Sequence, residues 1–273
     1  MSNKNILFIG CGKMGGVIID KITNNKNLAN NYYIIDPKNL DSQFNGSKNI
    51  SLHTNLADID NDFCADVIFL NIKPQNSAEI VNEISRLNIY NNDTIFISII
   101  AGKNLDFFTN ILGQNIKIVR TMPNLAIQYS HGIMPYKLSS NCSNDDKILI
   151  TAIFDNFGEI FEVSDEKLFD IITAIFGSGP AYIFYIQELI KNIAISNGLD
   201  QDIAEKLIKE LFLGSALIAK NSNKTFNDLI KDVTSKEGVT QSLMDNLQKS
   251  DSLNNIFRNA INKAKERSKE LNQ

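Results

Sequence analysis

Short runs of apolar residues recur along the first half of the chain, and segments with helical spacing of apolar positions separate several of them. The apolar runs are NILFIG (5–10), YYIID (32–36), DVIFLNI (66–72), TIFISII (94–100) and IKIVRTM (116–122). The helical patterns cover residues 14–22, 74–87 and 105–112. Short buried strands that alternate with helices are typical of a doubly wound parallel sheet. The first half of the chain is therefore predicted to be an α/β domain.

The alternation stops after the run EIFEV (159–163), and the rest of the chain shows only helical patterns. These patterns cover residues 166–175, 181–197 and 201–220, and two shorter helices begin at Val239 and Leu253. We therefore predict two domains with a boundary near residue 164. Residues 1–164 form the α/β domain around its doubly wound parallel sheet, and residues 165–273 form an all-helical domain.

Composition and charge exclude several classes of protein. Apolar residues make up 43% of the chain and charged residues 21%, which is typical of a globular protein. The formal net charge of −4 lacks the basic footprint of nucleic-acid binding. The longest apolar runs, such as TIFISIIA, are too short to span a bilayer, so no membrane partner is expected. Three cysteines without metal-ligand spacing, and a start without a signal peptide, favour a reduced cytoplasmic protein with no bound metal.

The first candidate site is the segment Gly10-Cys11-Gly12-Lys13-Met14-Gly15, which fits the pattern G-x-G-x-x-G. The segment follows a predicted strand and opens a predicted helix, the context in which this pattern binds a dinucleotide in a Rossmann-type domain. Gly10 permits the tight turn, Gly12 lets the backbone approach a pyrophosphate, and Gly15 lets helix and strand pack closely. An ordinary glycine turn in another α/β protein is the alternative.

An acidic residue, Asp36, ends the second predicted strand, about 20 residues beyond Gly15, the spacing that a dinucleotide site uses. An acid at this position accepts the ribose hydroxyls of the adenosine and repels a 2′-phosphate, which favours NADH over NADPH. Lys38 follows closely, and its positive charge offsets part of that repulsion. The phosphate state of the cofactor therefore stays open.

The chain offers few candidates for a general base. Of its two histidines, His53 is expected at the surface and His131 is expected to brace a loop. Oxidation of an alcohol by a nicotinamide needs such a base, and some two-domain dehydrogenases carry a lysine a few residues past the last glycine before the long helix. Here Ile183 stands four residues past Gly179, and the first lysine is Lys191. Reduction of a protonated imine needs no strong base, because the electrophile is already cationic.

Several further motifs resemble those of one family. FGSGPAY (176–182), which precedes a long helical pattern, and DVTSKEGVT (232–240) resemble the helical-domain signatures of pyrroline-5-carboxylate reductases. The second of them corresponds to the family pattern V-T/S-S-P-G-G-T-T. Four other segments match in order and spacing: IGCGKMG (9–15), IKPQ (72–75), SIIAG (98–102) and VRTMPN (119–124). The resemblance covers nearly the whole chain.

The resemblance implies that 1-pyrroline-5-carboxylate is reduced to L-proline by hydride transfer from NADPH or NADH, the last step of proline biosynthesis. It also implies which residues hold the cofactor. Ile9, Gly10, Cys11, Gly12, Lys13 and Met14 would wrap the pyrophosphate, Asp36 and Lys38 would face the adenosine ribose, and Asn55 would touch the adenine side. Asn71, Ile72, Lys73, Pro74, Ala101 and Gly102 would run along the cofactor towards the nicotinamide.

The resemblance places the substrate, a small imino acid, at the turn before the helix that begins at Val239. Ser235 and the backbone amides of Gly238, Val239 and Thr240 would hold its carboxylate, as an anion at a helix N-terminus. The Thr240 hydroxyl would lie near the ring nitrogen, so Ser235 and Thr240 are the candidate catalytic residues. We also expect Thr240 to cap the helix.

The chain departs from the family pattern at two places. Lys236-Glu237 stands where the family has Pro-Gly, and Asn124-Leu125-Ala126 stands where it has Asn-Thr-Pro. Two alternatives therefore remain beside the reductase. One is a related two-domain NAD(P)-dependent dehydrogenase of another small acid, and the other is a non-catalytic nucleotide-binding paralogue.

The helical pattern AYIFYIQELIKNIAISNG (181–198) is apolar on most of its sides. Tyr182, Ile186, Leu189, Ile190 and Ile193 share one face, and Ile183, Phe184 and Ile195 widen it. Such a helix needs burial from more than one direction, and a helical domain of this size has a small core of its own. We predict self-association as a homodimer through the helical domains, as the resemblance also implies, or as a larger assembly built from that dimer.

Overall fold

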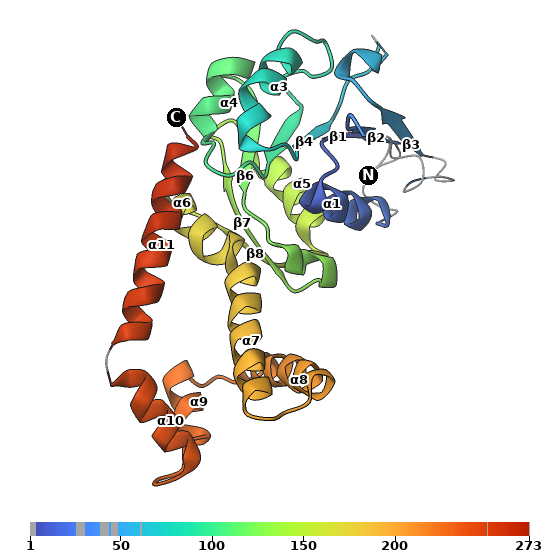
Figure 1. Cartoon of the computed structure of the whole chain (residues 1–273). Coiled ribbons are helices and arrows are strands. Elements are labelled where there is room, and N and C mark those ends of the chain that lie inside the picture. The colour runs from blue at the N-terminus through green and yellow to red at the C-terminus, as the bar shows by residue number, and fades with distance from the viewer. Residues whose placement is uncertain are drawn as a thin grey trace. The chain divides into compact units, whose positions relative to one another are not determined.

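The computed structural model describes residues 4–25, 31–38, 44, 49–60, 62–249 and 251–272. The chain forms two compact units (Figure 1). The first contains residues 1–178 together with 264–273, and the second contains residues 179–263. The units therefore divide the chain later than the predicted boundary near residue 164, and the end of the last helix belongs to the first unit.

Among the described residues, the first unit is built around an eight-stranded sheet. Its strands are β1 (Asn5–Ile9), β2 (Asn31–Ile35), β3 (Ile50–His53), β4 (Val67–Leu70), β5 (Ile95–Ser98), β6 (Lys117–Thr121), β7 (Gly132–Leu138) and β8 (Gly158–Glu162). The strand order is β3-β2-β1-β4-β5-β6-β7-β8, so the direction of winding reverses between β1 and β4. A ligand site is expected at such a switch point, beyond the carboxyl ends of the strands.

Neighbouring strands pair in parallel except for β6 and β7, which are antiparallel. The predicted α/β class with a doubly wound parallel sheet is therefore confirmed, with one antiparallel pair added. The sequence patterns did not predict β3 or β7. Strand β3 is a half-exposed edge strand, and β7 contains Pro135, so neither shows a continuous apolar run.

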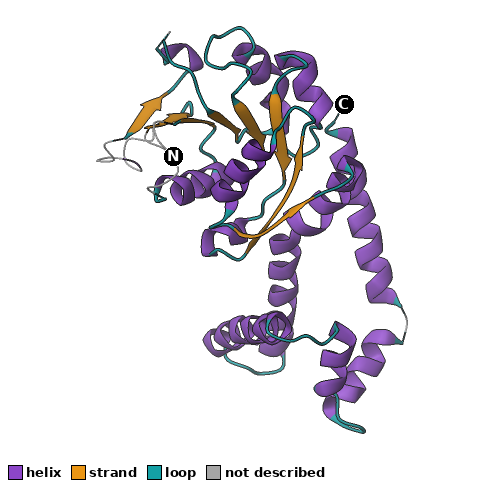
Figure 2. Cartoon of the chain, turned by 180° about the vertical axis from the view of Figure 1, so that it is seen from behind, coloured by secondary structure: helices purple, strands orange, loops and turns teal. Residues whose placement is uncertain are grey.

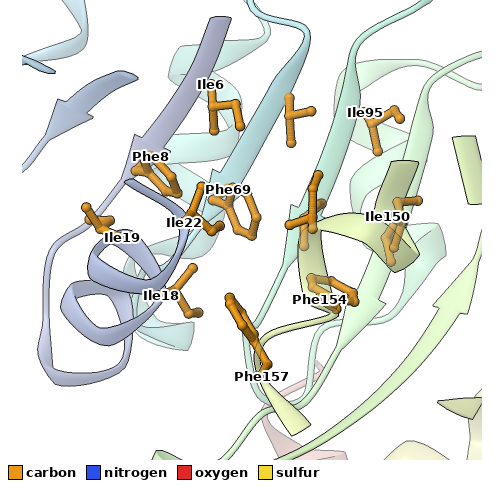
Figure 3. Close-up of a cluster of buried hydrophobic side chains, with 14 of the residues drawn as sticks. Ile6, Phe8, Ile18, Ile19, Ile22, Phe69, Ile95, Ile150, Phe154 and Phe157 are labelled. Atoms are coloured by element: carbon orange, nitrogen blue, oxygen red, sulfur yellow. The ribbon is translucent and has the colours of Figure 1, made fainter. Parts of the chain in front are cut away.

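Helices cover both faces of the sheet (Figure 2). On one face lie α1 (Lys13–Thr23) and α5 (Asn144–Phe154), whose apolar side chains join those of the strands in one buried cluster. Figure 3 shows this cluster, in which Phe8 and Phe69 stack with their ring centroids 5.0 Å apart. Because both faces are covered, each central strand buries its side chains on both sides and reads as a continuous apolar run.

The opposite face is covered by α3 (Ser77–Ile84) and α4 (Leu105–Leu112). Leu7 and Ile9 of β1 point to this face, while Ile6 and Phe8 point to the other. Short 3₁₀ helices occupy several loops: η1 (Leu56–Asp58), η2 (Pro74–Asn76), η3 (Leu125–Tyr129) and η4 (Glu166–Leu168).

The first unit ends with short helical segments. They are η4, α6 (Phe169–Ile172) and the π-helix η5 (Thr173–Gly177). The end of α11 (Ser252–Glu270) packs on the same unit, where the Ser268 hydroxyl donates to Asp170 Oδ1 at 2.7 Å. A π-helix of one turn leaves the regular hydrogen-bond pattern of an α-helix and is frequent at functional sites.

The second unit is entirely helical in the described residues, as predicted. It contains α7 (Gly179–Ser196), α8 (Gln201–Lys220), α9 (Phe226–Asp232), α10 (Val239–Gln248) and the first part of α11. Tyr182 of α7 meets Phe257 of α11 edge to face, with ring centroids 6.0 Å apart. The predicted helices over 181–197 and 201–220 correspond closely to α7 and α8.

Many large apolar side chains of the second unit are exposed in the single chain. They include Ile183, Phe184, Tyr185, Leu189, Ile190 and Ile193 of α7, and Ile203, Leu207, Leu211, Leu213, Leu217 and Ile218 of α8. The helical stretch Glu166–Ser196 is also long and apolar enough to cross a membrane, by length and composition alone. The uninterrupted apolar runs of the sequence did not indicate this stretch, because polar residues interrupt it. Exposed apolar surface on this scale marks an interaction surface.

Candidate functional site

Gly10 closes strand β1 in a conformation that favours glycine. Its φ is +97°, in the left-handed region, and a Cβ there would lie 2.6 Å from the backbone oxygen of Asn71. The Gly10 amide donates to the Ile35 carbonyl oxygen at 2.8 Å. The loop after β1 is therefore held directly beside the ends of β2 and β4, at the switch point of the sheet.

Gly12 and Gly15 differ in what surrounds them. A Cβ at Gly15 would lie 2.5 Å from the Gly10 carbonyl oxygen, so packing requires glycine at this position. A Cβ at Gly12 would meet nothing within 4 Å. Gly12 is the N-cap residue of α1, and no side chain caps the first turn. Free amides and open space at a helix N-terminus fit the pyrophosphate of a dinucleotide.

The Asp36 carboxylate is turned into the protein. Its Oδ2 accepts the Cys11 N–H at 2.7 Å, and its Oδ1 accepts the Lys38 N–H at 2.9 Å. Asp36 is 8% exposed, whereas Lys38 is exposed. Burial, together with the negative charge of Asp36, raises the pKa of the Cys11 thiol to about 11. The role expected for Asp36 at the ribose therefore competes with two backbone hydrogen bonds that it already accepts.

The end of strand β3 carries His53 and, beyond it, Asn55. The His53 ring stacks on Tyr33 with centroids 6.2 Å apart, and its Nε2 is buried. His53 is therefore half-buried on the edge strand β3, which the sequence patterns did not predict. Asn55 is exposed, and its backbone amide donates to Asp58 Oδ2 at 3.0 Å. Its side chain accepts the Asp58 N–H in the capping box of η1, and its Nδ2 donates to Thr54 Oγ1 at 3.1 Å.

Asn71 directly follows strand β4 and faces the glycine-rich loop. Its backbone N–H donates to the Ile9 carbonyl oxygen at 2.9 Å, and its Cβ would lie 3.0 Å from a Cβ placed on Gly15. Both polar atoms of the Asn71 side chain are buried without a partner among the described residues. An amide in this state is an exception that a bound polar group or water would resolve. The chain continues through Ile72, Lys73 and Pro74, and Pro74 opens η2.

Ala101 and Gly102 follow strand β5. Gly102 has φ +79°, and it is buried. A Cβ there would lie 2.5 Å from the Leu271 Cβ and 2.8 Å from the Ser268 carbonyl oxygen. The end of α11 therefore covers Gly102, which explains the glycine by packing. Ala101 is half-buried and packs beside a small cluster that includes Met122.

A contact that the sequence did not predict joins the loop after β6 to the π-helix. Asn124 Nδ2 donates to the Phe176 carbonyl oxygen at 3.1 Å, and Asn124 Oδ1 accepts the Ala126 N–H at 3.0 Å. The side chain thus fixes its own loop and holds the segment that precedes α7. The motifs VRTMPN and FGSGPAY marked both partners, but nothing in them indicated the contact. The Ala126 N–H is a donor that the family pattern lacks, because that pattern has proline at this position.

The turn before α10 lies in the second unit. Gly238 donates its N–H to the Ser235 carbonyl oxygen at 3.0 Å, and a Cβ on Gly238 would collide with Ser235 Oγ. Glu237 has φ +60°, a left-handed conformation for a non-glycine residue. Glu237 stands where the family pattern has glycine, so the turn keeps a backbone shape that suits glycine without that residue.

The N-cap residue of α10 is Gly238, and the helix begins at Val239. The expectation that Thr240 caps the helix is therefore wrong, because Thr240 lies one residue inside the first turn. Thr240 is half-buried, and within the described part of the chain its hydroxyl has no hydrogen-bond partner. The Gly238 amide is engaged in the turn, so the donors left for an anion are the amides of Val239 and Thr240 with the Ser235 hydroxyl.

The structure thus gathers most of the expected cofactor residues at the carboxyl ends of β1 to β5, in the first unit. The expected substrate residues lie together in one turn of the second unit. Among the described histidine, cysteine, aspartate and glutamate residues, no group of three is arranged to hold a metal ion. The chemistry that this arrangement can support is dinucleotide binding at the sheet and anion binding at the turn.

Two family models match the chain. The model of pyrroline-5-carboxylate reductase dimerisation matches residues 166–271. The model of NADP oxidoreductase, coenzyme F420-dependent, matches residues 5–102. The first match covers the chain from η4 to the end of α11, and the second covers the sheet from β1 to the loop after β5.

Known proteins resemble the chain over its whole length. It is 32% identical over 267 residues to a pyrroline-5-carboxylate reductase of Staphylococcus epidermidis, and the alignment covers 97% of both chains. Among solved structures it is similar to the pyrroline carboxylate reductase of Plasmodium falciparum with NADP bound, with a TM-score of 0.86 and 26% identity over the whole of both chains. The pyrroline-5-carboxylate reductase of Coxiella burnetii gives a TM-score of 0.85 and 28% identity, again over both whole chains.

Proposed function

The chain belongs to the pyrroline-5-carboxylate reductase family, and we infer from this premise that it reduces 1-pyrroline-5-carboxylate to L-proline with NADPH or NADH. The observation that carries the inference is the similarity to a curated reductase along nearly the whole of both chains. An open glycine-rich loop at the switch point of the sheet supports it independently. The reaction is the last step of proline biosynthesis.

We propose that the pyrophosphate of the cofactor lies over Gly12, at the start of α1. The open space at Gly12 and the uncapped first turn of α1 support this placement. The Asn71 side chain, buried without a partner, is well placed to bind the cofactor or a water molecule beside it. The remaining residues proposed to line the cofactor are Ile9, Gly10, Cys11, Lys13, Met14, Asn55, Ile72, Lys73, Pro74 and Ala101.

The proposed role of Gly102 is indirect. Because the end of α11 covers Gly102, this residue fixes the path of the loop after β5 and thereby positions Ala101. The bound nicotinamide supplies the hydride that reduces the substrate. The protein contributes the orientation of the cofactor through the loops after β1, β4 and β5.

We propose that the substrate carboxylate binds at the turn before α10. The Val239 and Thr240 amides lie in the first turn of the helix, where free N–H groups and the helix dipole favour an anion. The Ser235 hydroxyl adds a third donor next to Gly238. The Thr240 hydroxyl is free to bond to the ring nitrogen of the substrate. Ser235 and Thr240 are therefore proposed to orient the imine for attack.

The proposed chemistry suits a chain without a dedicated base. A protonated imine is already electrophilic at carbon, so hydride transfer produces the neutral amine of the ring directly. The two histidines have other surroundings, since His53 stacks on Tyr33 and His131 is exposed in the loop after η3. The protein therefore contributes orientation and charge complementarity. Holding the cofactor and the substrate close together in the reactive geometry can raise the rate by a large factor.

The family match includes a dimerisation domain, so the chain self-associates. We propose that the assembly is a homodimer, or a larger oligomer of dimers, in which the exposed apolar side chains of α7 and α8 are covered by a second copy. The same surface explains why Glu166–Ser196 is apolar enough for a membrane while no membrane is needed to bury it. Light scattering at micromolar concentration should give at least twice the chain mass of 30.5 kDa. A monodisperse 30.5 kDa particle would exclude the dimer.

We place the enzyme in the cytoplasm and expect it to bind neither nucleic acid nor a membrane. Three free cysteines and a net charge of −4 support this proposal. Fractionation of cells that express the chain should recover it without detergent. Recovery in the membrane fraction would contradict the proposal and would point to α7 as the anchor.

The experiment that tests the proposed function is a substrate panel. Oxidation of NADPH and of NADH is followed with 1-pyrroline-5-carboxylate, and the reverse reaction is followed with several small hydroxy acids. We expect activity with the imine alone. Activity with a hydroxy acid would indicate a related dehydrogenase instead, and cofactor binding without any turnover would indicate a non-catalytic paralogue.

A further inference from the structure

Asp36 connects two loops through both oxygens of its carboxylate. One oxygen accepts the N–H of Cys11, in the glycine-rich loop, at 2.7 Å. The other accepts the N–H of Lys38, beyond the end of β2, at 2.9 Å. The Asp36 backbone N–H donates to the His53 carbonyl oxygen at 3.2 Å, so the residue is also tied to β3. These contacts fix Asp36 from three sides.

The carboxylate is also shielded from the solvent. Asp36 is 8% exposed, although the next two residues, Pro37 and Lys38, are both exposed. An ionised carboxylate has spare acceptor capacity beyond two hydrogen bonds, but only where a donor can reach it. A ribose that used Asp36 would have to reach a group whose surface is already covered by the two loops.

The hydrogen bond from Cys11 also determines which amides can bind the cofactor. The Cys11 N–H points to Asp36, so it is not available to a phosphate oxygen. The donors left in this part of the loop are those at the start of α1, where Gly12 has open space above it. The position of that helix start depends on the turn at Gly10 and on the contact of Cys11 with Asp36.

We propose that Asp36 is a positioning residue that holds the glycine-rich loop in its pyrophosphate-binding shape, and that it does not read the 2′ position of the cofactor. The proposal rests on the proposed function, because it concerns the same cofactor site. Among the described residues, discrimination at the 2′ position then falls to the exposed Lys38, whose cation favours a 2′-phosphate. The chain therefore binds NADPH at least as tightly as NADH despite the acid at the end of β2.

The decisive variant is Asp36→Asn, which keeps the shape of the side chain and replaces one acceptor with an NH₂ group. That group would face a backbone N–H, so one of the two loops is released. We expect the dissociation constants of NADPH and NADH to rise together by about tenfold, the cost of losing one charge-assisted hydrogen bond. Their ratio should stay within about twofold of the parent. The matched variant Lys38→Gln should weaken NADPH binding and leave NADH binding unchanged.

A second measurement needs no cofactor. Amide hydrogen exchange in the unliganded chain should show the Cys11 and Lys38 N–H groups protected in the parent and exchanging at least about tenfold faster in Asp36→Asn. A role in stability alone would lower the melting temperature and leave the affinity of the folded variant intact, so affinities are measured well below that temperature. Such an outcome would overturn the proposal.

Two further results would also overturn it. The first is a shift of the affinity ratio towards NADPH in Asp36→Asn, because that is the signature of an acid that repels the 2′-phosphate. The second, which needs only the parent protein, is tighter binding of NADH than of NADPH. A parent that binds neither cofactor but protects the Cys11 amide would instead contradict the proposed function and leave the loop contact standing.

Discussion

Replacing Gly12 with alanine should remove most of the affinity for the cofactor while leaving the unliganded protein as stable as the parent. The loop offers a matched control in Gly15, which belongs to the same motif. A Cβ at Gly12 meets nothing within 4 Å, whereas a Cβ at Gly15 lies 2.5 Å from the Gly10 carbonyl oxygen. The two variants add the same methyl group, so they separate space reserved for a ligand from space filled by the protein.

The magnitudes follow from the local geometry. Gly12 has φ −72° and ψ −171°, which alanine adopts without strain. Alanine stabilises such a site by about 0.4–1 kcal/mol through the unfolded chain, and its poorer N-capping offsets a similar amount. The free energy of unfolding should therefore change by less than about 0.5 kcal/mol. Gly15→Ala forces the backbone to move and should cost about 1–3 kcal/mol.

Gly12→Ala should have a large effect on cofactor binding, in contrast to its small effect on stability. A methyl group on Gly12 would stand where a phosphate oxygen approaches the start of α1, and losing one hydrogen bond to a charged group costs about 1.5–3 kcal/mol. The dissociation constant for NADPH should therefore rise about 10- to 100-fold. Calorimetric melting without cofactor and titration of NADPH fluorescence measure the two quantities. Unchanged NADPH affinity in Gly12→Ala would refute the placement of the pyrophosphate, and a loss of stability equal to that of Gly15→Ala would refute the open space.

Three further predictions concern other parts of the chain. Thr240→Ser should keep most activity, whereas Thr240→Val should lose at least about tenfold in kcat/KM with NADPH affinity unchanged, because the hydroxyl orients the substrate. A fully active valine variant would contradict that role of the hydroxyl. The free energy of unfolding should be about 1 kcal/mol higher for Glu237→Gly than for Glu237→Ala, because both variants remove the charge but only glycine adopts φ +60° without strain. Equal free energies of unfolding would contradict the backbone strain at this position. Burial acts to raise the pKa of Asp146, but hydrogen bonds from Ser143 and Lys117 outweigh it and lower the pKa. The stability that Asp146 contributes is therefore present at neutral pH and is lost as the pH falls through that lowered pKa. In Asp146→Asn the melting temperature should therefore fall less than in the parent between pH 6 and pH 3, about the range in which carboxyls titrate.

The central strands could be predicted from the sequence because both of their faces are buried. Helices on either side of the sheet leave β1, β4 and β5 no exposed face, and their residues therefore form continuous apolar runs. The edge strand β3 has one neighbour and half-exposed residues, so its pattern resembles that of a loop. The start of helix α5 carries a local signal of its own, since Ser143 and Asp146 form a capping box there.

The glycine-rich loop could also be predicted, because the backbone conformation and the close backbone packing in this loop require glycine at fixed positions. A left-handed φ at Gly10 and a close approach at Gly15 exclude other residues, so the motif itself reports the geometry. The direction of the Asp36 carboxylate could not be predicted in this way. That direction depends on where the backbone amides of two separate loops point, and no sequence pattern in either loop indicates this.

The turn before α10 shows the same limit. The pattern around Ser235 identified the segment, but it did not show that Gly238, and not Thr240, is the N-cap residue. Nor did it show that Glu237 adopts the left-handed conformation that the family pattern assigns to glycine. Both facts depend on how the turn closes through the hydrogen bond between Gly238 and Ser235, which is a property of the folded backbone.

The most direct test of the account is to follow the transferred hydrogen. The chain is incubated with 1-pyrroline-5-carboxylate and NADPH that carries deuterium at both C4 positions of the nicotinamide, and the product is analysed by mass spectrometry and NMR. The account predicts L-proline with one deuterium on the ring carbon that was double-bonded to nitrogen in the substrate, formed in equal amount to the NADP⁺ released. Proline without deuterium, or oxidation of the cofactor without proline, would contradict it.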